Sequence, residues 1–159
     1  MLTARSHDAN ESLSLGKILG RLAPPNCVIA LFGDLGSGKT HFVKGCVEGF
    51  AGCGHEEVSS PTYAYLHIYG KQKKVYHFDL YRLNDAEEFF GMGFDEYFDT
   101  DGLTCIEWSE KIASYLPQDT LYIRMEKSGE NERLLNFSSH NSALLTSIKK
   151  ELPCHATIH

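Results

Sequence analysis

The eight-residue stretch GDLGSGKT, Gly33 to Thr40, constrains the fold more than any other part of the chain. Its spacing, Gly-x4-Gly-Lys-Thr, fits a phosphate-binding loop, which requires a strand before it and a helix after it. The preceding run CVIALF (27–32) lies between Pro24-Pro25-Asn26 and a glycine, which is typical of a short buried parallel strand. Apolar residues then recur at helical spacing from Phe42 to Phe50, which predicts a helix with one apolar face.

The residues of this loop have the chemical properties that phosphate binding needs. Three glycines allow the backbone N–H groups to turn inward at the positive end of the following helix. Lys39 is expected to reach the terminal phosphates, and the Thr40 hydroxyl is expected to ligate Mg²⁺. The alternative is a glycine-rich turn with an exposed lysine, and the strand and helix patterns on either side disfavour it. The predicted nucleotide-binding residues of this segment are Gly33, Asp34, Leu35, Gly36, Ser37, Gly38, Lys39, Thr40 and His41.

Composition indicates an ordinary globular domain. At 159 residues, 42% of them apolar and 23% charged, the chain is expected to form one domain, 1–159, that buries roughly 70% of its unfolded surface. The net charge of -6 argues against a basic face that binds nucleic acid directly. We expect no secretory signal and no membrane-spanning helix, since no apolar stretch is long enough. Five cysteines without a C-x-x-C pair or zinc-ligand spacing are expected to be reduced, as in a cytoplasmic protein.

The other patterns along the chain predict alternating helices and strands. A short turn, Gly70-Lys71-Gln72, joins two of the predicted strands too tightly for them to be parallel. The expected fold is therefore a single α/β P-loop NTPase-like domain whose mixed parallel and antiparallel sheet is flanked by helices. Helices are predicted over 12–22, 86–98 (capped by Asn84 or Asp85), 109–116 and 141–150, strands over 63–69, 73–83, 102–108, 120–125 and 133–139, and a frayed end over 151–159.

A phosphate loop alone does no chemistry, and the segment HFDLYR offers a carboxylate that phosphoryl transfer needs. His77 and Asp79 share one face of their predicted strand, because side chains alternate between the two faces. Asp79 lies at the strand end, where it could hold or activate a water near the terminal phosphate. The alternative is a structural pairing of Asp79 with Arg82.

Two further segments offer polar groups at predicted strand ends, where ligands bind in such sheets. In CIEWSE, Glu107 follows two apolar residues and is expected to assist Mg²⁺, while Trp108 is expected to lie over the nucleotide or in the core. In SSPTY, Thr62 follows a proline and is expected to sense the terminal phosphate as a switch loop does. The aromatic segment FFGMGFDEYF is expected to pack mainly into the core, with a docking surface as the alternative.

These segments together resemble the TsaE family. GDLGSGKT, SPTY, HFDLYRL, EEFFGMGFDEYF and IEWSEK occur in the order, and at about the separations, found in these small bacterial ATPases of tRNA threonylcarbamoyladenosine biosynthesis. The similarity spans about 12–111. It implies a P-loop fold, ATP with Mg²⁺, weak intrinsic hydrolysis, and action alongside the partner proteins TsaD and TsaB, with tRNA contacted only through them.

The resemblance also implies roles for individual residues. Thr40 and Glu107 correspond to the residues that approach the metal, and Thr62 and Asp79 to those tied to the ATP cycle. Trp108 corresponds to a tryptophan near the nucleotide. The segment 7–12 is expected to pass near the adenine, without one residue being assigned. His41 is a departure, because many relatives carry a second threonine there, and nothing beyond Pro117 is carried over.

Three hypotheses follow from the sequence. The first is an ATPase, with Lys39, Asp79 and Thr62 as catalytic residues, whose turnover drives or resets a tRNA-modifying complex. The second is a small-molecule kinase with Asp79 as base and Arg82 clamping the phosphoryl group, although no arginine-rich lid insertion is visible. The third is a nucleotide-gated binding module in which the Thr62 loop changes shape without significant turnover.

Overall fold

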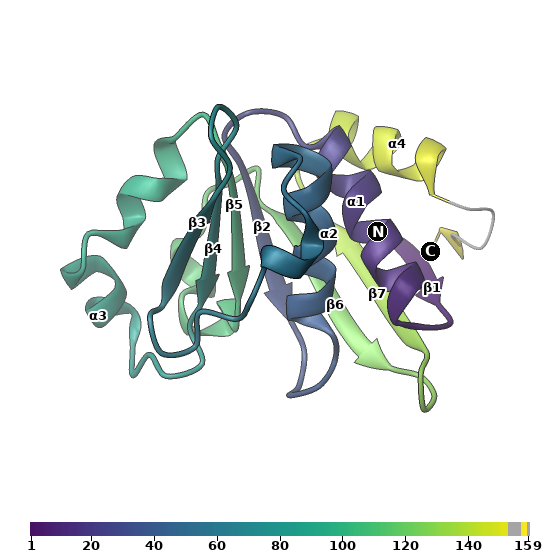
Figure 1. The fold of residues 1–159 in the computed structure, drawn as a ribbon, viewed down its shortest axis with the longest axis horizontal. Coiled ribbons are helices and arrows are strands. Elements are labelled where there is room, and N and C mark those ends of the chain that lie inside the picture. The colour runs from purple at the N-terminus through teal and green to yellow at the C-terminus, as the bar shows by residue number, and fades with distance from the viewer. Residues whose placement is uncertain (153–156, 159) are drawn as a thin grey trace.

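The computed structural model describes residues 1–152 and 157–158, which form one twisted sheet with helices against both faces (Figure 1). Within these residues the sheet has eight strands in the order β3-β4-β5-β2-β6-β7-β1-β8. The four central strands, β4, β5, β2 and β6, are parallel, and every strand outside them pairs antiparallel. The strands are β1 (Leu2–Ser6), β2 (Cys27–Phe32), β3 (Leu66–Tyr69), β4 (Val75–Asp79), β5 (Leu103–Glu107), β6 (Leu121–Lys127), β7 (Arg133–Ser138) and β8 (Thr157–Ile158).

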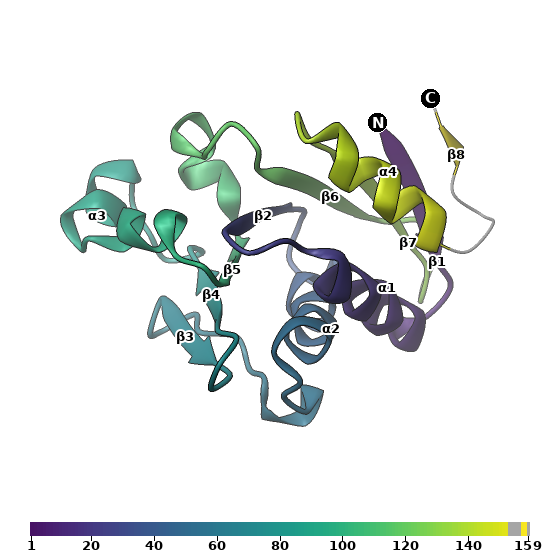
Figure 2. The same cartoon turned by 90° about the horizontal axis from the view of Figure 1, so that it is seen from above.

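The helices divide between the two faces of the sheet. Figure 2 shows α1 and α2 lying side by side against one face, and α3 lies on the far side of the central strands. In Figure 1, α4 lies at the end of the sheet opposite the loop that joins β2 to α2. The α-helices are α1 (Ala9–Leu22), α2 (Lys39–Ala51), α3 (Ala86–Gly91) and α4 (Ser142–Glu151), and short 3-10 turns occupy η1 (His55–Glu57), η2 (Phe94–Asp99), η3 (Ser109–Lys111) and η4 (Ala113–Tyr115).

Glycines on facing sides allow α1 and α2 to pack backbone against backbone. A Cβ on Gly16 would lie 2.2 Å from the Phe42 carbonyl oxygen, and one on Gly45 would lie 2.1 Å from the Leu13 carbonyl oxygen. Such distances are too short for any side chain, so larger residues would push the helices apart. This close packing fixes the position of α2, whose N-terminus carries the phosphate loop. Gly20 and Gly49 make the same kind of contact one turn further along.

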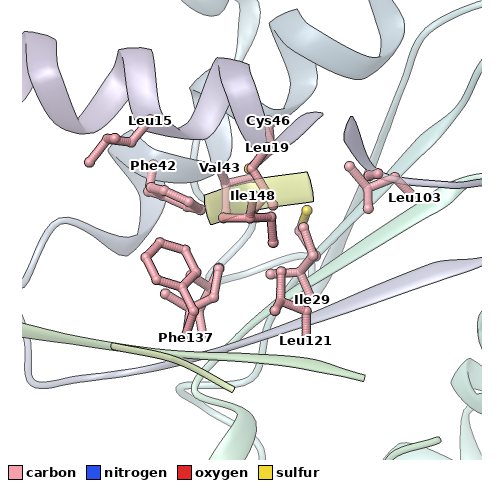
Figure 3. Close-up of a cluster of buried hydrophobic side chains, with 14 of the residues drawn as sticks. Leu15, Leu19, Ile29, Phe42, Val43, Cys46, Leu103, Leu121, Phe137 and Ile148 are labelled. Atoms are coloured by element: carbon pink, nitrogen blue, oxygen red, sulfur yellow. The ribbon is translucent and has the colours of Figure 1, made fainter. Parts of the chain in front are cut away.

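The hydrophobic core has two parts, one on each face of the sheet. The larger part joins α1, α2 and α4 to the sheet, and Figure 3 shows Leu15, Phe42, Ile29, Phe137 and Ile148 within it. Ile29, Phe42, Leu121 and their neighbours are wholly buried there, which makes burial of apolar area the main stabilising contribution of this face. The smaller part is rich in aromatic residues and packs the segments after β4 and β5 against the opposite face: Val28, Tyr76, Phe78, Leu80, Leu83, Phe89, Phe98, Ile106 and Ile112.

Most predicted elements are confirmed, and the exceptions have physical causes. The predicted helix over 109–116 is wrong: two 3-10 turns take its place, because eight residues are too few for a helix that tertiary packing does not favour. The predicted helix over 86–98 is α-helical only to Gly91, since Gly93 (φ 72°) interrupts it and a 3-10 turn follows. The strand predicted from Tyr63 begins only at Leu66, because Tyr65 has a positive φ of 64°.

Both ends of the chain differ from the pattern that the sequence predicts. The strand β1 precedes α1 and was not predicted, and α1 begins at Ala9 because Asp8 caps it by accepting from the Glu11 N–H. Within the segment predicted to fray, Glu151 ends α4, Leu152 is buried, and β8 pairs with β1. The rest of that segment, 153–156 and 159, lies outside the described residues.

Candidate functional site

The loop between β2 and α2 has the backbone of a phosphate-binding loop. Gly33, Gly36 and Gly38 have φ angles of 146°, 76° and 98°, which side-chain-bearing residues rarely adopt. A Cβ on Gly33 would also lie 2.3 Å from the Met125 carbonyl oxygen of β6. Gly38 caps α2, so the free N–H groups of that helix open toward the loop. The local sequence therefore gives this loop the backbone conformation that phosphate binding requires, and the binding of a nucleotide stays a prediction.

Lys39 lies folded over this loop. Its ammonium donates to the carbonyl oxygens of Gly33 and Asp34, the latter at 3.1 Å, and stands 4.1 Å from the centre of the Trp108 ring. Burial lowers the pKa of the Lys39 ammonium, while four nearby carboxylates, with Glu107 contributing most, oppose that shift. The ammonium thus satisfies its hydrogen bonds with loop carbonyls, which are the weaker partners that an anionic phosphate would displace.

Thr40, Glu107 and His77 form a buried chain of hydrogen bonds beside the loop. The Thr40 hydroxyl donates to both Glu107 oxygens, at 2.8 and 3.0 Å. His77, wholly buried on β4, lies with Nε2 2.7 Å from Glu107 Oε1. Its other ring nitrogen has no partner among the described residues, so the tautomer that donates from Nε2 to the carboxylate leaves no buried N–H unpaired. Two parallel strands, β4 and β5, thereby hold Glu107 against the first turn of α2.

Asp79 ends β4 and holds the segment that contains Thr62. The hydroxyls of Ser60 and Thr62 both donate to Asp79 Oδ2, at 2.5 and 2.8 Å, and the Tyr81 N–H donates to Oδ1 at 3.0 Å. Asp79 is buried, so these donors replace the water that its carboxylate loses. The predicted alternative, a pair between Asp79 and Arg82, is not formed: the Arg82 guanidinium lies 4.7 Å from the centre of the Tyr63 ring.

Trp108 follows Glu107 in the left-handed region, with a φ of 58°. This conformation turns the indole away from the direction of β5 and toward the phosphate loop. The Tyr81 ring packs against it with centroids 4.9 Å apart, and the Lys39 ammonium lies over its face. Strained backbone at such a position is typical of functional sites.

These groups surround one cavity of about 550 Å³. It is lined by residues from the loop, from α2, from the Thr62 segment and from the ends of β4 and β5. Among the predicted site residues, Gly33, Asp34 and Ser37 lie outside this lining and face a second hollow beside β6. The lining residues are Leu35, Gly36, Gly38, Lys39, Thr40, His41, Lys44, Ser60, Thr62, Asp79, Tyr81, Glu107 and Trp108.

The donor set around this cavity fits Mg²⁺. Glu107 and Thr40 present hard oxygen ligands, and Asp79 adds a carboxylate on the same face of the sheet. Within the residues that the structure describes, no three His, Cys, Asp or Glu side chains gather as a complete metal cage. Magnesium commonly uses one or two carboxylates together with substrate phosphates, so this partial set suits it better than a structural metal.

The sequence did not single out Ser60 or Arg133 as site residues. Ser60 stands two residues before Thr62, and that spacing is the only local signal for it. Arg133, at the start of β7, donates from Nε to the Ser37 carbonyl at 3.0 Å and from Nη2 to the Gly36 carbonyl at 3.3 Å. No local pattern predicts this contact, because the partners are 96 and 97 residues apart.

The start of α1 lies beside the phosphate loop, where the sequence predicts the adenine. Ala9 and Ser12 share a small cavity of about 90 Å³ with Gly38, His41 and Arg133. Burial, with a smaller contribution from Lys44, lowers the pKa of His41 below its ordinary value of 6.5. A neutral imidazole at this position adds no charge beside the loop, and the assignment of the adenine to this side remains a prediction.

Comparison with known proteins places these features in a family. A family model described as "Threonylcarbamoyl adenosine biosynthesis protein TsaE" matches residues 6–135. The chain is 36% identical over 136 residues to the tRNA threonylcarbamoyladenosine biosynthesis protein TsaE of Bacillus subtilis (strain 168), covering 85% of this chain and 84% of that protein. It is 38% identical over 128 residues to the protein of the same description from Treponema pallidum (strain Nichols), covering 80% and 93%.

A solved structure has the same fold. The crystal structure of YdiB from Bacillus subtilis superposes with a TM-score of 0.74 at 28% sequence identity, covering 94% of this chain and 95% of that one. The mixed α/β architecture predicted from the sequence is thereby confirmed. Within the described residues, no helix is both long enough and apolar enough to cross a membrane.

Proposed function

Because the chain belongs to the TsaE family of threonylcarbamoyladenosine biosynthesis proteins, we propose that it is a Mg²⁺-dependent ATPase with weak intrinsic activity. Its turnover would drive or reset a tRNA-modifying complex in the cytoplasm, together with partner proteins of the TsaD and TsaB type. Membership of the family confirms the resemblance that the sequence motifs indicate.

One observation carries the proposal. The phosphate loop with Thr40, the Thr62 segment, Asp79 at the end of β4 and Glu107 at the end of β5 are four separate segments, and all line the same cavity. A loop that binds phosphate, a hard-metal ligand pair and a carboxylate for water are the three parts that phosphoryl transfer to water requires. Their convergence supports ATP hydrolysis more than any of them does alone.

The chain's own residues have distinct tasks in this proposal. Mg²⁺, when bound with ATP, would neutralise charge on the phosphate oxygens. Thr40 and Glu107 would hold it, with His77 keeping the Glu107 carboxylate in place. Lys39 would exchange its loop carbonyls for phosphate oxygens. Asp79 would orient a water and accept its proton, after its bonds to Ser60 and Thr62 rearrange.

The binding-module alternative has one observation in its favour. The hydroxyls of Ser60 and Thr62 both donate hydrogen bonds to Asp79 Oδ2. A water activated by Asp79 would have to donate to this same oxygen. If nucleotide binding only released this contact, the loop would change shape without hydrolysis. The kinase alternative has less support, because Arg82 is engaged with Tyr63 instead of the cavity.

ATP turnover with and without the partner proteins tests the proposal. The isolated chain should hydrolyse ATP slowly, and a purified TsaD–TsaB pair should raise the rate. Asp79→Ala should lower turnover about 10²-fold or more while ATP binding persists, and Asp119→Ala, an exposed carboxylate outside the cavity, serves as the control.

Three other results would decide against this assignment. Full support of tRNA modification by the Asp79 variant would favour the binding module. Transfer of labelled γ-phosphate to a metabolite would favour the kinase. An ATP hydrolysis rate that does not change when the partner proteins are added would contradict the proposed role in the complex.

A further inference from the structure

The segments after β4 and β5 form a region with an unusual charge. We define this acidic lobe as residues 81–102 and 109–118, which include α3 and the 3-10 turns η2, η3 and η4. It contains eight carboxylates and two cations, a net charge of -6, which equals the net charge of the whole chain. The remainder of the molecule is therefore electrically balanced, and the acidity is confined to this region.

The two cations of the lobe are already engaged. The Lys111 ammonium donates to the Leu83 carbonyl oxygen at 2.9 Å, and the Arg82 guanidinium lies over the Tyr63 ring. Exposed carboxylates such as Glu87 and Glu96 thus face solvent, and neither forms an ion pair with Arg82 or Lys111. The outer surface of the lobe consequently carries a negative potential that attracts basic groups.

The same lobe exposes three large apolar side chains that do not line the cavity beside the phosphate loop. Phe90, Met92 and Tyr115 are 37%, 41% and 59% exposed. The rings of Phe90 and Tyr115, which come from separate segments, pack edge to face with centroids 5.2 Å apart. Glu87 lies three residues before Phe90 on α3, so it stands on the same side of that helix.

These side chains rest on a rigid base. Phe89, wholly buried next to Phe90, stacks on Phe98 and packs against Phe78 and Phe94. An exposed aromatic pair held by a packed core loses little conformational freedom on binding, which is typical of interface hot spots. The patch has the residue types that are enriched at interfaces, namely aromatic residues and methionine.

The lobe is also connected to the candidate catalytic groups. Its two segments begin two residues after Asp79 and Glu107, and the intervening Leu80 donates its N–H to the Glu107 carbonyl oxygen at 3.1 Å. In Figure 1 the lobe lies on the opposite side of the molecule from α1 and α4. A contact on the lobe can therefore act on the ends of β4 and β5 without covering α1.

We propose that the acidic lobe docks a partner protein whose apolar pocket, rimmed by Lys and Arg, receives Phe90, Met92 and Tyr115. Charge complementarity selects this occupant. RNA is disfavoured because its phosphates would meet carboxylates, and a second copy of the chain is disfavoured because two lobes of net charge -6 repel. The inference rests on the proposed function, to which it adds the surface through which partners act.

The experiment measures binding of the chain to a purified TsaD–TsaB pair by biolayer interferometry with ATP and Mg²⁺ present. The double variant Phe90→Ser/Tyr115→Ser should weaken binding at least tenfold, and Glu87→Lys should slow association and flatten its salt dependence. Matched controls are Ile68→Ser, an exposed apolar residue on β3, and Glu126→Lys, an exposed carboxylate on β6. Both controls should bind within twofold of the unmodified chain.

The outcomes separate the inference from the proposed function. Equal binding by the patch variants and the unmodified chain, with thermal midpoints unchanged, would overturn the docking surface and leave the proposed function standing. Absence of binding by the unmodified chain would overturn both. If the patch variants mainly lose a dimer that light scattering detects in the unmodified chain, the patch binds a second copy and the inference is overturned. If they mainly lose tRNA binding, the patch binds RNA and the inference is also overturned. Intrinsic ATP turnover should not change in any patch variant.

Discussion

The parallel centre of the sheet and its antiparallel side are built differently. Strands β4 and β5 are buried at every residue, and β2 at every residue but its last. Strands β1 and β7 instead alternate between buried and more exposed positions, as does β6, which pairs parallel with β2 and antiparallel with β7 and so joins the two regions. Helices or turns cover both faces of the centre, whereas the antiparallel side buries one face only.

The functional groups follow this division. The phosphate loop, Asp79 and Glu107 all stand at the carboxyl ends of the parallel strands, where a crevice for a ligand forms in such sheets. The antiparallel strands contribute apolar side chains such as Phe137 and Leu135 to the core. We infer that changes at the parallel ends should affect chemistry more than stability, and that changes in the antiparallel side should do the reverse.

The largest effect is expected from Lys39→Ala at the parallel end. It should lower kcat/KM for ATP by about 10³-fold, because the cation that would stabilise developing charge on the phosphates is lost. The free energy of unfolding should change little, since the buried ammonium is also costly to desolvate. Calorimetry of ATP binding and a turnover assay measure the effect, with the exposed Lys71→Ala as control. Unaltered turnover would remove Lys39 from the site.

The second prediction concerns the antiparallel side. Phe137→Ala should lower the free energy of unfolding by about 3–5 kcal/mol, because it leaves a cavity in the larger core. Turnover per folded molecule should stay within about twofold at low temperature, as the loop lies elsewhere. Urea titration measures the stability, and Ser138→Ala, exposed on the same strand, is the control. A large loss of turnover at full folding would contradict the division between the two regions.

Glu107→Gln tests whether Glu107, at the carboxyl end of the parallel strand β5, is a ligand of Mg²⁺. The amide keeps the size of the side chain but loses the charge, so the Mg²⁺ concentration for half-maximal turnover should rise about 10- to 100-fold. A magnesium titration at fixed ATP measures it, and the exposed Glu110→Gln is the matched control. If the magnesium dependence of the Glu107 variant stays unchanged, that residue is not a ligand.

The smallest effect is expected at Arg133. This residue is an exception to the division between the two regions, because it starts an antiparallel strand and yet contacts the phosphate loop. Arg133→Ala should raise KM for ATP about tenfold, since two charge-assisted bonds to loop carbonyls are lost. Arg133→Lys should restore part of it, because an ammonium replaces one of the two donors. Arg124→Ala, which removes a cation of the neighbouring strand β6 that lies over the Phe32 ring, should leave KM within twofold. A change in stability without a change in KM would make Arg133 purely structural.

The elements that local patterns specify strongly were predictable. The continuous apolar run of β2 and the helical spacing of apolar residues in α2 each specify their own element, because β2 is buried along almost its whole length and α2 has one buried face. The segment 109–116 and the N-terminal strand β1 were not predictable. Short stretches there take their conformation from packing, Ile112 being buried and Leu2 pairing with Phe137.

The site divides in the same way. GDLGSGKT specifies the backbone conformation of its own loop, since glycine conformations and the N–H groups of the next helix are properties of neighbouring residues. The contacts of Thr40 with Glu107, 67 residues apart, and of Arg133 with Ser37, 96 residues apart, exist only because the strand order and register bring these residues together. A linear spacing cannot encode such a juxtaposition, because the free energy that selects it comes from burying the whole sheet and its helices.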